Sequence, residues 1–144
     1  MYNLLLKSYK NSKGIFVDRK TAKEEALKIM ERYNVSAESV DSPVKNLSGG
    51  NIQKILLGRE IGTDPNVIIT AYPVRGLDIN SSYMIYDILN EEKAKNTAIL
   101  FIGEDLDVLL TFCDKIMVLC EGRNMGIVHT KETTKEEIGL MMTG

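Results

Sequence analysis

Leu47-Ser48-Gly49-Gly50-Asn51-Ile52-Gln53-Lys54 is the stretch that decides the fold, because a serine and two glycines stand directly before a helical pattern. Apolar residues recur after the glycines at the spacing of one helix face. Gly62 and then Pro65 supply the expected end of that helix. We therefore expect residues 48–50 to lie at a helix N-terminus. The apolar residues of the expected face are Ile52, Ile55, Leu56 and Ile61.

A helix N-terminus can bind an anion. Its first amides lack partners within the helix, and the helix dipole adds about half a positive charge there. Two glycines let a phosphate approach the backbone closely, and Ser48 adds a hydroxyl donor. An ordinary N-cap, in which Ser48 accepts an early amide and the glycines form a turn, explains these residues equally well. The choice between the two depends on the wider pattern.

Composition excludes several classes of protein. A chain of 144 residues, 44% hydrophobic and 26% charged, is long enough for one globular domain with a core and is not disordered. The net charge of −2, with both signs interspersed, argues against a general nucleic-acid binder. No apolar stretch reaches the roughly 18 residues of a membrane span and no signal-peptide pattern opens the chain, so we expect a cytosolic protein. Cys113, Cys120 and His129 lack metal-site spacing, which favours buried thiols and a surface histidine.

Short continuous apolar runs predict strands that are buried in a parallel sheet. The run at 115–120 turns back through Glu121-Gly122-Arg123-Asn124 as a β-hairpin. Helical patterns separate the runs, and this alternation indicates an α/β fold with a largely helical segment before it. The expected strands are 67–71, 97–102, 115–120 and 125–128.

Capping residues mark the expected helices. Thr21 and Glu24 form a capping box ahead of an apolar stripe, and Thr134 and Glu137 form another before the last helix. An apolar stripe is more often core than ligand site, so we assign the stripe no chemistry. Its members are Ala22, Ala26, Leu27, Ile29, Met30 and Tyr33. Two further helices are expected at 80–95, capped by Asn80, Ser81 or Ser82, and at 105–113.

The order of these motifs resembles the ATP-binding-cassette ATPases. Residues 47–51 match the signature motif, residues 67–72 the Walker B strand and residues 75–78 the D-loop. The similarity is greatest to the cassettes of simple-sugar and nucleoside importers, specifically to the second cassette of their tandem-cassette proteins. It implies a helical signature subdomain at 1–62 and the C-terminal half of an incomplete RecA-like P-loop NTPase core, a parallel sheet with a C-terminal hairpin, at 63–144. The other matching segments are Asn3-Leu4, Lys7-Ser8-Tyr9, Asp41-Ser42-Pro43-Val44, Glu104-Asp105-Leu106-Asp107, Glu121-Gly122-Arg123 and Glu137-Ile138-Gly139-Leu140-Met141.

Cassettes of this family pair head to tail, which assigns a role to the signature residues. The resemblance implies that Ser48, Gly49, Gly50 and Asn51 contact the ATP held by a partner cassette. Asp78, in the D-loop position, would help to order the same interface. ATP and magnesium are therefore expected in the full assembly, and neither is expected on this chain alone.

The pocket that belongs to this half is expected to be degenerate. No segment of the form GxxxxGK[ST] occurs, so we expect a truncated cassette. Walker B strands end in an aspartate for magnesium and a glutamate that activates water, whereas this chain has Ala71 and Tyr72. Glu104 stands, within one residue of register, at the position of the switch histidine, and a carboxylate there would repel a γ-phosphate. None of the three is expected to be catalytic.

Three functions of different classes remain open. The first is one half of an ATPase that powers import of a sugar or nucleoside at the inner face of the membrane, with permease subunits and, indirectly, a solute-binding protein as partners. The second is a non-transport ATPase of the same superfamily, but no long coiled-coil insertion or basic face supports it. The third is a non-catalytic interaction module. No nucleic-acid partner is expected, and the solute is not readable from this sequence.

The resemblance also bears on assembly. In the resembling fold the strand that carries the phosphate loop lies between the strands at 97–102 and 115–120. Without that strand the edges of two apolar strands stay open, and such edges pair with another chain. We therefore expect a homodimer. The alternative is that strand 115–120 moves by about 4.8 Å and pairs directly with strand 97–102.

Overall fold

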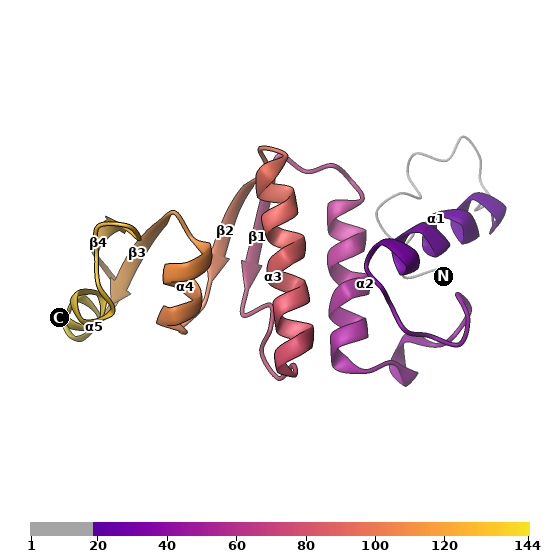
Figure 1. The fold of residues 1–144 in the computed structure, drawn as a ribbon, viewed down its shortest axis with the longest axis horizontal. Helices are drawn as coiled ribbons and strands as arrows, with labels where there is room; N and C mark the ends of the chain where they lie inside the picture. The colour runs from indigo at the N-terminus through magenta and orange to yellow at the C-terminus, as the bar shows by residue number, and fades with distance from the viewer. Residues whose placement is uncertain (1–18) are drawn as a thin grey trace. The chain divides into compact units, whose positions relative to one another are not determined.

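The computed structural model of the protein describes residues 19–144 (Figure 1). The sequence matches at Asn3-Leu4 and Lys7-Ser8-Tyr9 lie outside the described residues. Helices and strands alternate after a helical opening, which confirms the predicted α/β fold. The elements are α1 (Arg19–Arg32), a 3-10 turn (Val44–Asn46), α2 (Gly49–Ile61), β1 (Val67–Ala71), α3 (Ile79–Ala94), β2 (Ala98–Ile102), α4 (Leu106–Phe112), β3 (Lys115–Cys120), β4 (Arg123–His129) and α5 (Lys135–Thr143).

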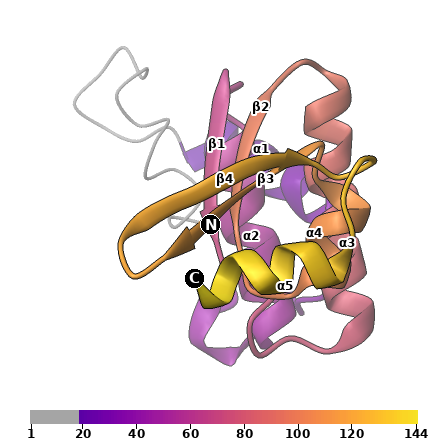
Figure 2. The ribbon, with the colours of Figure 1, turned by 90° about the vertical axis from the view of Figure 1, so that its left-hand side faces the viewer.

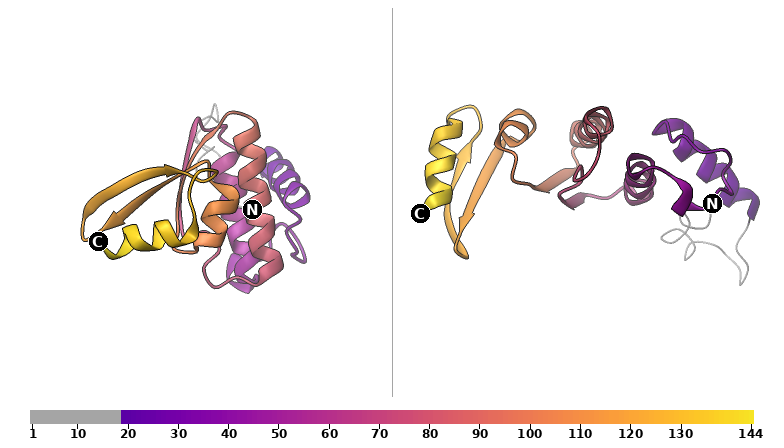
Figure 3. Two further views of the ribbon diagram at one scale, coloured as in Figure 1. Left: turned by 60° about the vertical axis from the view of Figure 1, so that its left-hand side comes forward. Right: turned by 90° about the horizontal axis from the view of Figure 1, so that it is seen from below.

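The chain forms two compact units. The first consists of the residues up to Ile68 together with Pro73–Leu100, and the second of Ile69–Tyr72 and Phe101–Gly144. In the first unit α1 packs against α2 and α2 packs against α3, which runs beside it (Figure 3). The predicted signature helix and the helix after the D-loop are therefore neighbours in one unit.

α1 approaches α2 most closely at Gly58. A Cβ atom at this position would lie 2.7 Å from Cγ2 of Ile29 and 2.8 Å from two ring carbons of Tyr33. Because no side chain fits there, glycine allows this approach. The buried apolar residues of the first unit are Ala22, Ala26, Tyr33, Val35, Val40, Leu57, Ile61, Ile68, Ile85, Tyr86, Ile88 and Leu89.

The start of α1 and the faces of two helices differ from the prediction. α1 begins at Arg19, so Thr21 lies inside its first turn and does not cap it. Leu27 is 50% exposed, and Ile52 and Leu56 are 37% and 41% exposed. Apolar residues occur on more than one side of α2, so their spacing alone does not select the buried side. The residues of α2 that are buried are Gly50, Lys54, Leu57, Gly58 and Ile61.

In the second unit β3 and β4 form the predicted antiparallel hairpin, with β4 longer than expected. Met117 pairs with Ile127, and the register is irregular between Val118 and Leu119. Figure 2 shows α5 alongside this hairpin, and α5 contacts both strands. The core of the unit consists of Leu109, Ile116, Val118 and Ile138, with Phe101, Leu106, Leu110, Cys113, Val128 and Met141 packed against it.

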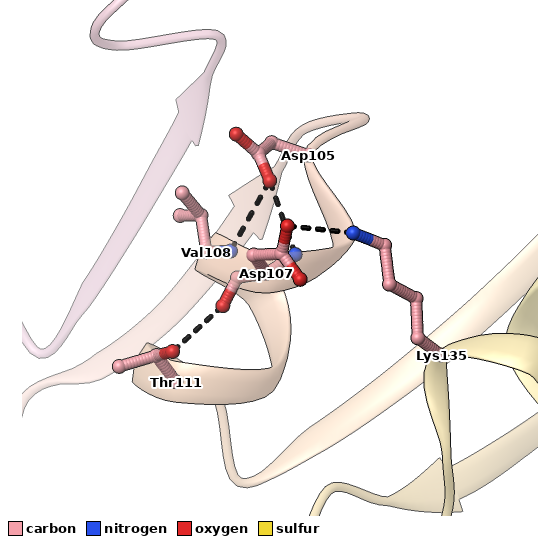
Figure 4. A network of polar contacts seen from close by, with 5 residues as sticks. All are labelled: Asp105, Asp107, Val108, Thr111 and Lys135. Atoms are coloured by element: carbon pink, nitrogen blue, oxygen red, sulfur yellow. Dashed lines mark hydrogen bonds and ion pairs between the residues drawn. The ribbon is translucent and has the colours of Figure 1, made fainter.

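Side-chain caps start both helices of the second unit. Asp105 caps α4 through the amides of Asp107 and Val108, and the predicted capping box of Thr134 and Glu137 is present at α5. Nζ of Lys135 lies 2.6 Å from Oδ2 of Asp107 and so joins the two helix starts (Figure 4).

The strands form two separate sheets among residues 19–144, β1 with β2 and β3 with β4. Ala98 donates to the carbonyl of Asn66 and Tyr72 donates to the carbonyl of Ile102, so β1 and β2 run parallel. The prediction that these strands are fully buried is wrong. Ile68 is buried on one face, and large apolar residues are exposed on the other face in the described part. The exposed apolar residues of β1 and β2 are Val67, Ile69, Leu100 and Ile102.

Three smaller expectations can also be compared with the structure. Cys113 and Cys120 are half-buried, whereas the sequence predicted that they are buried; Cys113 packs against the core of the second unit. His129 is exposed, as expected. Within residues 19–144, every helix is too short or too polar to cross a membrane.

Candidate functional site

Ser48 starts α2 as predicted. Its backbone is extended, with φ −65° and ψ 157°, and its Oγ accepts a hydrogen bond from the backbone N–H of Asn51 at 3.4 Å. Gly49 and Gly50 form the first turn, where backbone N–H groups have no partner inside the helix. Ser48 and Gly49 are exposed. This end of α2 therefore offers a hydroxyl and amides to an anion.

Asp78 starts α3, and not the three residues that the sequence suggested. Its Oδ1 accepts the N–H of Ser81 at 2.9 Å, and its Oδ2 accepts the hydroxyl of Ser81 at 2.7 Å. These bonds, first the one to the Ser81 hydroxyl, hold the pKa of the Asp78 carboxyl below its usual value. Asn80, Ser81 and Ser82 do not cap α3, because Asp78 precedes them and its side chain accepts the backbone N–H of Ser81.

The two helix starts lie against each other. A Cβ atom on Gly50 would be 2.5 Å from Oγ of Ser81, and one on Gly49 would be 3.4 Å from Cδ2 of Leu77. The structure thus brings the predicted signature residues and the predicted D-loop residue Asp78 together. A Cβ atom at position 50 would displace Ser81, so glycine at this buried position allows the close packing of the two helix starts.

Asn51 points back toward the chain that precedes α2. Its Nδ2 donates to Oγ of Ser48 at 3.0 Å, and its Oδ1 accepts the backbone N–H of Ser36 at 2.9 Å. One turn further, Nζ of the buried Lys54 donates to the carbonyl of Asn34 at 3.0 Å. The sequence pattern assigned no role to Ser36 or Lys54. A lysine three residues after Asn51, on the same side of the helix, was the available signal.

Ala71, Tyr72 and Glu104 lie at the carboxyl ends of β1 and β2, the usual place for ligands in a parallel sheet. The N–H of Tyr72 donates to the carbonyl of Ile102 at 2.8 Å, which brings the two strand ends together. Tyr72 has φ 50°, a left-handed conformation that is uncommon outside glycine, and its side chain is 43% exposed. Glu104 is exposed as well.

This second place does not fit a magnesium ion. Ala71 has no ligand atom, and magnesium prefers carboxylates and water. Within residues 19–144, no three carboxylate, histidine or cysteine side chains gather as a metal site. The start of α2, in contrast, presents a hydroxyl and backbone amides and no carboxylate of its own, which is the chemistry of an anion site.

Comparison with characterised proteins identifies sugar-import ATP-binding proteins as relatives. The xylose import ATP-binding protein XylG of Moorella thermoacetica is 36% identical over 142 residues, which are 99% of this chain and 28% of XylG. The ribose import ATP-binding protein RbsA of Lactococcus lactis is 38% identical over 131 residues, 91% of this chain and 26% of RbsA. The chain therefore spans about a quarter of these relatives. No family profile matches it.

Solved structures give the same fold. An ATP-binding cassette of an ABC transporter superposes on 96% of this chain with a TM-score of 0.72 and 26% identity, and the match covers 56% of that cassette. A dimeric cassette bound to ADP and phosphate superposes with a TM-score of 0.74 at 18% identity, over 90% of this chain and 55% of the cassette. The fold is therefore that of part of a P-loop NTPase cassette.

Proposed function

Because this chain is homologous to about a quarter of the ATP-binding proteins of sugar importers, we propose that it is an ATP-binding part of an importer for sugars or nucleosides. Its signature residues, Ser48 to Asn51, complete the ATP site of a partner cassette. The exposed start of α2, packed against the D-loop, is the observation that carries this proposal.

The chemistry of that start suits a partner's nucleotide. Ser48 can donate its hydroxyl proton, and the first amides of a 13-residue helix add an aligned dipole. Both carboxylate oxygens of Asp78 accept bonds from Ser81, so Asp78 orders the turn beside the signature residues. Preorganised donors of this kind stabilise the charge that develops during phosphoryl transfer.

The ATP site that belongs to this half is inactive in our proposal. Ala71 and Tyr72 replace the magnesium ligand and the base, and Glu104 places a negative charge where phosphoryl transfer needs a donor. The assembly then hydrolyses ATP mainly at the site completed by Ser48. Magnesium and ATP are held by the partner cassette, and permease subunits at the inner face of the membrane complete the importer.

The test is ATP turnover of the assembled importer. Ser48→Arg fills the start of α2 with a bulky cation and removes the hydroxyl donor, so we expect turnover to fall on the order of a hundredfold. Thr63→Arg adds the same side chain at an exposed position in the turn that follows α2 and should leave turnover nearly unchanged. Near-normal turnover in Ser48→Arg would refute the assignment.

A further inference from the structure

The hydrogen bond between Ser36 and Asn51 determines the orientation of the Asn51 amide. A backbone N–H can only donate, so the atom of Asn51 that faces it at 2.9 Å must be the carbonyl oxygen Oδ1. The other end of the amide, Nδ2, then faces Oγ of Ser48 at 3.0 Å. Nδ2 carries only hydrogens to share, so Ser48 must accept that bond.

Ser48 also accepts the longer bond from the backbone N–H of Asn51 at 3.4 Å. A hydroxyl has two acceptor positions and one proton. With both acceptor positions directed at Asn51, the proton of the exposed Ser48 hydroxyl points away from Asn51. We propose that Asn51 is a positioning residue that sets the polarity of the Ser48 hydroxyl, so that its proton is offered to an oxyanion at the start of α2. This inference rests on the proposed function only for the identity of that oxyanion, a nucleotide phosphate.

The end of α1 holds Ser36 in place. Val35, the preceding residue, is buried and donates its N–H to the carbonyl of Met30 at 2.8 Å. Lys54 binds the carbonyl of Asn34 from α2 at 3.0 Å. These two contacts hold the chain directly before Ser36, so the polarity of the Ser48 hydroxyl depends on the packing of that segment as well as on Asn51.

Asn51→Asp changes the hydrogen-bonding character of the side chain at position 51 but keeps its size and shape. The variant keeps an oxygen for the Ser36 amide but turns a second oxygen toward Ser48, so the Ser48 hydroxyl must donate inward. Asn51→Leu removes both side-chain bonds but keeps the bond from the backbone N–H of residue 51, so the Ser48 proton is no longer held in one direction. Gln53→Glu makes the same amide-to-carboxylate change two residues along α2 and controls for added charge near the helix start.

Two NMR measurements on the protein decide the proposal. In a titration with inorganic phosphate followed at the Gly49 and Gly50 amides, we expect Asn51→Asp to weaken binding more than about tenfold and Asn51→Leu and Gln53→Glu only about two- to threefold. Because its amide is hydrogen-bonded to Asn51, we expect amide exchange at Ser36 to be slow in the wild type and in Asn51→Asp and fast in Asn51→Leu. If Asn51 had only a structural role, the order would be reversed, and Asn51→Leu would weaken phosphate binding more than Asn51→Asp. Equal phosphate affinities for Asn51→Asp and Gln53→Glu would overturn the proposal.

The second measurement needs no anion. One Asn51 side-chain N–H proton should move downfield relative to its partner, and Ser48→Ala should abolish that shift. If the Asn51 side-chain resonances did not change in Ser48→Ala, the proposed direction of the Ser48 hydroxyl would be refuted, independently of the phosphate titration. Absence of any phosphate response in the wild-type chain would count against the proposed function instead, and the Asn51 resonances would still decide the polarity.

Discussion

At the scale of single residues, Gly50 allows the start of α2 to pack closely against α3. Its α-carbon faces Ser81, whose hydroxyl is already committed to Asp78 at 2.7 Å. We predict that Gly50→Ala destabilises the protein by about 1–3 kcal/mol, because the added methyl group must displace Ser81 from its bond. Urea denaturation of the two proteins measures the difference.

Gly49→Ala is the matched control for this prediction. It lies in the same helical turn, and its Cβ would meet only Cδ2 of Leu77 at an ordinary 3.4 Å. A small effect is expected, since alanine also favours the helix. If the two variants were equally stable, close packing against Ser81 would not be the reason for glycine at position 50.

Asp78 makes stability depend on pH. Its pKa is lowered in the folded state by the bonds from Ser81, so its stabilising contribution is complete above the unfolded value of about 3.9 and is lost as the pH falls through the lower folded value. Asp78→Asn mimics the protonated side chain. We predict that this variant is less stable than the wild type at pH 7 and that the difference disappears on acidification below about pH 4.

Chemical denaturation at several pH values tests the Asp78 prediction. Ser81→Ala removes the hydroxyl bond but keeps the bond from the Ser81 amide, so it should reproduce part of the effect. A stability difference between Asp78→Asn and the wild type that stays constant from pH 7 to pH 3 would contradict the assignment.

At the scale of elements, Glu92 joins α1 to α3. Its side chain is only 4% exposed and its Oε1 accepts from Arg32 at 3.2 Å and from Lys95 at 2.5 Å. The two cations are 48% and 50% exposed, so each can return to water if the carboxylate is lost. The buried carboxylate of Glu92 cannot return to water, so it needs at least one of the two cations as a partner.

This asymmetry predicts strong non-additivity. Arg32→Met and Lys95→Met should each cost about 1 kcal/mol, because the other cation still neutralises Glu92. The double variant leaves a buried charge unpaired and should cost about 3–5 kcal/mol. A double-mutant cycle in urea measures the coupling, and the pair Lys28→Met with Lys95→Met, in which Lys28 is an exposed residue of α1, should be additive. Additive costs for Arg32 and Lys95 would show that Glu92 is solvated.

At the scale of the whole molecule, the outer face of the β3–β4 hairpin is apolar. Met117 and Ile127 are partners across the two strands and are 50% and 61% exposed, and Leu119 beside them is 62% exposed. The opposite face carries Ile116 and Val118, which pack in the core. Such an exposed apolar surface favours association. The homodimer that we expected from the open strand edges stays a prediction. β2 and β3 lie in separate sheets, so the alternative of direct pairing does not occur among the described residues.

We predict that the protein self-associates at high micromolar concentration and that Met117→Lys shifts it toward the monomer. Lysine at this position keeps the hairpin but breaks the apolar patch. Light scattering after size exclusion gives the mass of each species, and Thr111→Lys, at an exposed position of α4, is the control for added charge. A wild-type chain that stays monomeric would refute the prediction.

The sequence by itself determined the elements whose causes are local. Ser48 at the start of α2, the capping box of Thr134 and Glu137, and the strand at 115–120 follow from hydrogen bonds and apolar spacing within a few residues. The family resemblance rests on the same short motifs. These features were predictable because caps and turns require particular side chains at particular offsets.

Only the tertiary structure decided which surfaces meet. Gly50 lies against Ser81, Asn51 binds Ser36 across 15 positions, and Arg32 reaches Glu92 across 60. Ile52 and Leu56 are exposed, although the apolar pattern had assigned them to the buried face of α2. This exposure was also decided by the tertiary structure. A helix with apolar residues on several sides buries the side that its neighbours cover, and the positions of neighbours depend on the packing of the whole unit. Periodicity along one helix contains no information about that choice.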